Sequence, residues 1–291
     1  MTKQQELEDK TIKAIIKIID WLKIPKKYLN FDLGAEVSYI PNGGNGYSPR
    51  TRVIEYSDDT PKTIFHESSH YLHHVINPHL DEIPWVKEPS RLYIHILSET
   101  FAHATDLHFC EKGNMIHIDD FLQSTTLKHE EYTKWDSDLG RLLEEGKENR
   151  VRALVESNPE FSKKWLFWAY VNLALKKGNE LCDDLKLYAI KGSPFSKSKK
   201  RIMESYAKNV LEKSEKFYPS RYGINIHQIV ACAIGYDLAF EINKYHDSNP
   251  KAAKKLLRDI ITAKDDNIVR TVYKSFRQIY RFFEKKMINA S

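Results

Sequence analysis

The spacing of apolar residues along the chain is that of amphipathic helices over most of its length. Residues 3–23 carry Ile, Trp and Leu on one stripe among charged residues, and the stripe ends before Pro25. Residues 222–245 are the most apolar part, with small residues at intervals that favour close packing on a neighbouring helix. Residues 250–287 predict two further amphipathic helices, broken near 265–267. We expect a chain that is mainly helical.

Two short segments alternate between apolar and polar residues, as strands do. They are residues 35–40 and 51–57, separated by a loop with three glycines at 41–46. Strands that are close in sequence and joined by such a loop usually pair as a hairpin. The predicted fold class is therefore α+β, mainly α with a small β-hairpin or sheet.

The second of these strands leads into a helix that contains His-Glu-x-x-His. Thr60 and Pro61 predict its start, because a hydroxyl caps a free amide and proline fits the first helical position. His66 and His70 lie one turn apart on the same face, so both imidazoles can reach one ion. Glu67 lies beside them, where it can act as the general base. This motif predicts a metal centre.

A second helix, expected over residues 87–109, carries a carboxylate in its middle. Glu99 shares one stripe with His95, His103 and Asp106. Burying an unpaired carboxylate among apolar residues costs several kcal/mol, and a metal ion would remove that cost. Glu99 is therefore the predicted third ligand, while His95 and His103 are expected to line the cleft.

His66-Glu67-x-x-His70 followed by Ser98-Glu99-x-x-Ala102 resembles the gluzincin metallopeptidases. The resemblance implies that His66, His70 and Glu99 bind one Zn2+ ion and that Glu67 accepts the proton of the zinc-bound water. It implies a zincin-like core, a peptide or protein substrate, and substrate lying antiparallel along the strand at 51–57.

The resemblance covers residues 51–109 and departs from the thermolysin type in two ways. The 28 residues between His70 and Glu99 make a longer spacing, and His103 stands where that type has Asp. Asp106, one turn later, could hydrogen-bond a ligand in its place. His-Glu-x-x-His-Tyr-Leu-x-His also resembles the ImmA/IrrE-type peptidases, without a helix-turn-helix module.

Gluzincins use a Tyr or His on a later helix to stabilise the oxyanion, and Tyr222 and His227 are the candidates here. A structural histidine on a buried helix is the equal alternative for His227. His73 and His74 follow the motif, and we expect both at the surface. The alternatives are that one of them is a fourth ligand or forms a hydrogen bond with a ligand.

Composition bounds the remaining possibilities. A chain of 291 residues can form a core of one or two domains, here 1–115 and 116–291. The pattern of residues 117–215 predicts charged helices, with an aromatic cluster at 165–170 expected to be core. Three cysteines without a CxxC pair favour a reducing compartment. The first residues lack a signal-peptide pattern, so we expect a cytoplasmic protein that does not bind a membrane.

Two other function classes stay open. One is a catalytically inactive zinc-binding interaction protein; the other is a basic, helical nucleic-acid-binding protein. The second rests on a net charge of +5 and a basic run at 196–201, which we expect to be a solvated loop. Without a recognised nucleic-acid fold signature it ranks last, and the oligomeric state is open.

Overall fold

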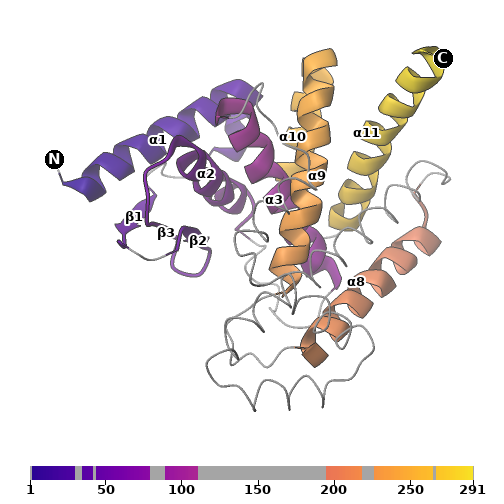
Figure 1. Ribbon diagram of the computed structural model, residues 1–291, viewed down its shortest axis with the longest axis horizontal. Coiled ribbons are helices and arrows are strands. Elements are labelled where there is room, and N and C mark those ends of the chain that lie inside the picture. The colour runs from indigo at the N-terminus through magenta and orange to yellow at the C-terminus, as the bar shows by residue number, and fades with distance from the viewer. Residues whose placement is uncertain are drawn as a thin grey trace, which may run out of the picture.

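The structure is a computed structural model, and its elements confirm the predicted α+β class: helices dominate and one three-stranded sheet accompanies them (Figure 1). The residues that it describes are 2–29, 35–41, 44–78, 89–110, 195–217, 226–264 and 267–290.

The first helix, α1 (Lys3–Leu22), ends where the sequence predicts. Thr2 caps its start, because the Thr2 hydroxyl accepts from the Gln5 amide while the Gln5 side chain accepts from the Thr2 amide. Its last turn closes with Lys23 in the left-handed region, and a single 3-10 turn follows at Lys26–Tyr28.

The sheet corrects the predicted hairpin. Its strands are β1 (Glu36–Tyr39), β2 (Gly46–Ser48) and β3 (Val53–Tyr56), in the spatial order β1-β3-β2. β1 and β3 pair in parallel, whereas β2 and β3 form the antiparallel hairpin through a tight turn with Arg52 at positive φ. β2 begins at Gly46, the last residue of the glycine-containing loop, and it rather than β1 is the hairpin partner of β3.

The histidine motif lies on α2 (Pro61–Ile76), and the Glu99 side chain comes from α3 (Pro89–Cys110). Thr60 caps α2 as predicted, accepting from the Thr63 amide. Loss of such a cap costs about 1 kcal/mol. α2 packs along α3, so the motif faces the middle of the longer helix (Figure 1).

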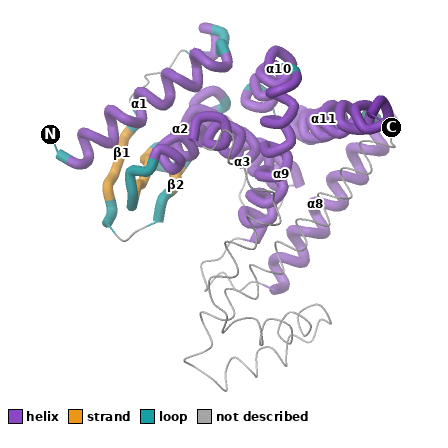
Figure 2. Tube along the Cα trace, turned by 45° about the horizontal axis from the view of Figure 1, so that its top comes forward, coloured by secondary structure: helices purple, strands orange, loops and turns teal. Residues whose placement is uncertain are grey.

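The long apolar segment predicted near residue 230 is α9 (Ile226–Ser248), and it packs directly on α3. α10 (Pro250–Ile261) and α11 (Ile268–Ala290) follow, and α8 (Lys197–Phe217) precedes it. As Figure 2 shows, α3 lies between α1, α2 and the sheet on one side and the C-terminal helices on the other. The largest fully buried side chains come from both groups: Leu7, Ile15, Ile18, Leu22, Ile54, Tyr56, Leu72, Tyr93, Phe101, Tyr236, Tyr273 and Phe276.

The basic run at 196–201 is not the expected loop. It opens α8, and its Lys199 is buried, donating to the Tyr273 hydroxyl at 2.7 Å. The aromatic cluster at 165–170 and the charged helices expected before 195 lie outside the described residues. Among the helices that the structure describes, none has both the length and the apolarity to cross a bilayer.

Candidate metal centre

Two histidines of α2 and one glutamate of α3 converge on a common point. The Nε2 atoms of His66 and His70 are 3.1 Å apart. The Glu99 carboxylate lies 3.8 Å from His66 Nε2 and 3.7 Å from His70 Nε2, through different oxygens. The three side chains are 15–18% exposed, so they face a partly closed interior space rather than open solvent. The structure therefore brings together the three residues that the sequence singles out as ligands.

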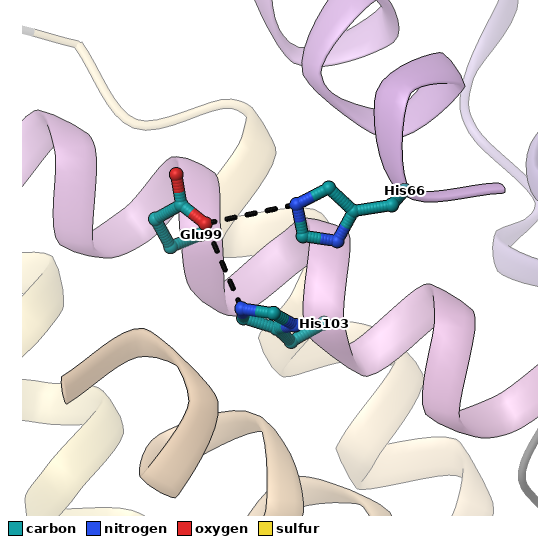
Figure 3. Close-up of side chains that lie close together, drawn as sticks. All are labelled: His66, Glu99 and His103. Carbon is teal, nitrogen blue, oxygen red and sulfur yellow. Dashed lines mark ion pairs between the residues drawn. The ribbon is translucent and has the colours of Figure 1, made fainter. Parts of the chain in front are cut away.

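A third imidazole joins this group. His103, one turn after Glu99 on α3, places its Nε2 atom 3.7 Å from the same Glu99 oxygen that faces His66 (Figure 3). One ligand atom from each of His66, Glu99 and His103 lies within 4.8 Å of the other two, and this group could hold a metal ion. Three imidazoles thus surround the Glu99 carboxylate group.

The opposite nitrogens of these imidazoles are held by fixed partners. Asp106 Oδ2 lies 2.9 Å from His66 Nδ1 and 3.3 Å from His103 Nδ1. An ionised carboxylate only accepts hydrogen bonds, so both Nδ1 atoms donate and both Nε2 atoms face Glu99. His70 Nδ1 shares a hydrogen bond of 2.8 Å with Ser98 Oγ. Asp106 thus contacts His66, as the sequence suggests, and such partners orient imidazoles that bind metals.

The charges around the histidines favour a cation. Burial alone would lower the pKa of His66, but the hydrogen bond and charge of Asp106 raise it to about 9. Burial also opposes ionisation of Asp106, yet the hydrogen bonds from His103 and His66 lower its pKa to about 2. Burial, followed by the positive charge of His66, lowers the pKa of His70. Positive charge is thus favoured at His66, and a bound metal ion would take the place of its Nε2 proton. His70 keeps a neutral ring suited to ligation.

Glu67 is buried at 7% exposure on the same helix face. Burial raises the pKa of Glu67 to about 7, and the charge of His66 and a hydrogen bond from the Tyr47 backbone amide oppose that rise. Tyr47 lies on β2, and its hydroxyl forms a hydrogen bond with His74 Nδ1. The edge strand is therefore fastened to α2 beside the carboxylate, which fixes where the predicted base points.

The predicted ligand set fits a metal ion on three observations. Two nitrogen ligands of a tetrahedral zinc lie about 3.3 Å apart, because each Zn–N bond is about 2.0–2.1 Å long. The separations of 3.1, 3.7 and 3.8 Å are within about half an ångström of that value. The donors are imidazole and carboxylate, which several divalent metal ions accept as ligands. Lastly, the buried Asp106 carboxylate contacts His66, and its Oδ1 atom has no hydrogen-bond partner among the described residues, so a negative group lies directly beside the donors.

The remaining histidines of the motif are not where the sequence suggested. His73 and His74 were expected at the surface, and that prediction is wrong: they are 3% and 6% exposed. His73 lies edge-on to Phe101 of α3, and His74 binds Tyr47 of β2, because α2 is covered on both of those sides. His95 is half-buried and its charge lowers the pKa of His70, so it lies beside the cluster.

The two proposed oxyanion donors remain predictions. Tyr222 lies outside the described residues. His227 is in the first turn of α9, where the structure describes the backbone but not the side chain.

Sequence reasoning missed two donors. His103 was assigned to the cleft wall, although its spacing of four residues from Glu99 was the available signal. Cys232 of α9 was not considered, yet its Sγ atom lies 3.4 Å from His103 Nε2. Burial, then the charges of Glu99 and Asp106, raises the pKa of the Cys232 thiol. Nothing in the local sequence tells which helix of a bundle will face α3.

Compared with protein-family models, with curated proteins and with solved structures, the chain finds no match. The geometry of the centre is therefore the basis for its functional interpretation.

Proposed function

We propose that the chain is a zinc-dependent metallopeptidase in which His66, His70 and Glu99 hold the ion and Glu67 is the general base. One observation carries the proposal: two motif imidazoles meet a carboxylate from a separate helix, with a second buried carboxylate beside them. Zinc bound there would supply a Lewis acid that lowers the pKa of a water molecule and polarises the substrate carbonyl.

Glu67 has the environment that a general base needs. Its pKa of about 7 lets the carboxylate accept a proton at neutral pH and return it to the leaving amine. The Tyr47 amide holds one carboxylate oxygen, so the group is aimed before substrate binds.

The sheet changes the expected place of substrate. β3 pairs on both sides over residues 53–55, so it cannot accept an extended peptide along residues 51–57 as predicted. β2 is the edge strand beside Glu67, and its outer edge is where a peptide would add antiparallel. Tyr222 and His227 remain the proposed oxyanion donors.

The first experiment tests the metal and the base separately. Glu67→Gln should retain zinc at wild-type stoichiometry and lose turnover of a protein or peptide-library substrate by at least about 100-fold, the usual contribution of general base catalysis. Glu99→Ala should lose both, because it removes a ligand. Metal content is read by mass spectrometry, and cleavage by peptide mass analysis.

Glu55→Gln is the matched control, since this carboxylate lies exposed on β3. It should leave zinc and turnover unchanged. Undiminished cleavage by Glu67→Gln would exclude Glu67 as the base, and full zinc occupancy in Glu99→Ala would exclude the ligand set.

A second candidate is a zinc-binding interaction protein without hydrolytic activity. The nearness of His103 to Glu99 favours it, because a fourth protein ligand leaves no position for water. Retained zinc with no cleavage across a broad peptide library would identify this function.

A further inference from the structure

Cys232 faces the metal centre from the side opposite the histidine motif. Its Sγ atom is 3.4 Å from His103 Nε2, and the nearby charge of Glu99 raises the pKa of its thiol after burial does. The side chain therefore contacts His103 and lies near Glu99, and both belong to the donor group.

The packing of α9 on α3 brings the thiol there. A Cβ placed on Gly235 would lie 2.5 Å from Glu99 Cβ, so the two helices touch backbone to backbone at this point. Cys232 precedes Gly235 by three residues and shares its face of α9. The close approach thus delivers a sulfur atom to the level of His103, one turn along α3 from Glu99.

The separations agree with ligation of one ion. With bonds of about 2.3 Å to sulfur and about 2.0–2.1 Å to nitrogen, tetrahedral ligands lie about 3.5 Å apart. The observed sulfur–nitrogen distance is 3.4 Å. The Glu99 oxygen is 3.7 Å from His103 Nε2 and 3.8 Å from His66 Nε2.

The charges around Cys232 explain how its thiol could bind a metal ion. Within the described residues, Glu99 and Asp106 pair with histidines and with no lysine or arginine. Negative charge keeps a thiol protonated, but a dication reverses the local field, and a coordinating thiol loses its proton to solvent.

We infer that Cys232 is an additional ligand of this centre, bound to the same ion as its neighbours His103 and Glu99. The inference rests on the metal site of the proposed function. It makes the preferred ion a thiophilic one such as zinc, cobalt or cadmium, rather than magnesium or manganese. It also gives the protein a closed form of the site, with sulfur in the place that hydrolysis reserves for water.

Cobalt(II) is the probe, because a sulfur ligand gives it an intense near-ultraviolet charge-transfer band that nitrogen and oxygen ligands do not. The full chain is stripped with a chelator and loaded with one equivalent of cobalt. Wild type should show the band. Cys232→Ser should bind cobalt without it, and Cys110→Ser, the matched control at the end of α3, should keep it.

A double variant covers the case in which Cys232→Ser fails to fold. Cys110→Ser with Cys182→Ser leaves Cys232 as the only thiol of the chain, and it should retain the full band. Cobalt bound without a band in wild type, or a band that persists in Cys232→Ser, overturns the role of Cys232 and leaves the proposed function standing. No cobalt bound by wild type overturns both.

Discussion

Gly235→Ala tests the contact on which the geometry of the centre depends. The added Cβ would lie 2.5 Å from Glu99 Cβ, 2.8 Å from the Thr100 amide nitrogen and 3.0 Å from the Glu99 carbonyl carbon. Carbon atoms pack at about 3.5–4.0 Å, so the shortfall is about 1–1.5 Å. Two of the three neighbours are backbone atoms, which no rotamer change can move. The helices must therefore separate by about 1 Å.

The expected cost follows from opposing contributions. Overpacking of this kind costs typically about 1–3 kcal/mol, while alanine gains about 1 kcal/mol over glycine in a helix interior. We expect a net loss of about 0–2 kcal/mol in the free energy of unfolding. Metal affinity should fall by more than about tenfold, because ligand distances tolerate only about 0.2 Å.

Urea denaturation and competition with a chromophoric chelator measure the two effects on the same samples. Gly44→Ala is the control, since a Cβ there meets nothing within 4 Å. A Gly235→Ala variant with wild-type midpoint and wild-type zinc affinity would refute the view that close helix contact positions Glu99.

Two further predictions concern charged contacts. Asp106→Asn should lower zinc affinity about 10- to 100-fold with unchanged far-ultraviolet circular dichroism, because a neutral amide oxygen accepts from His66 and His103 more weakly than a charged carboxylate does. Equal chelator competition curves would contradict this. Hydrogen bonds with Lys10 and Lys3 lower the pKa of Asp59 to about 2. The ionised Asp59 carboxylate therefore stabilises the folded chain above the unfolded pKa of 3.8, and this stabilisation is lost as the pH falls towards 2. The difference in Tm between wild type and Asp59→Asn should therefore narrow from pH 6 to pH 3. A difference that stayed constant would show that it does not come from the ion pairs of Asp59 with Lys10 and Lys3.

Local sequence patterns were sufficient to predict the described helices and part of the candidate metal centre. Thr60 and Pro61 set the start of α2 because a cap acts on amides within one turn. His66 and His70 share a face because four residues nearly complete a turn, whatever the helix packs against. The break before α11 and the end of α1 before Pro25 follow from the same short-range rules.

These short-range rules do not predict contacts between segments that are distant in sequence. The parallel pairing of β1 with β3 depends on where the chain crosses, and the burial of His73 and His74 depends on what covers α2. His103 and Cys232 come from helices whose mutual rotation is set by the whole core. The sequence by itself determined which residues can act together within one helix turn. The tertiary structure decided which helix faces meet, because each helix buries its apolar face against several others at once.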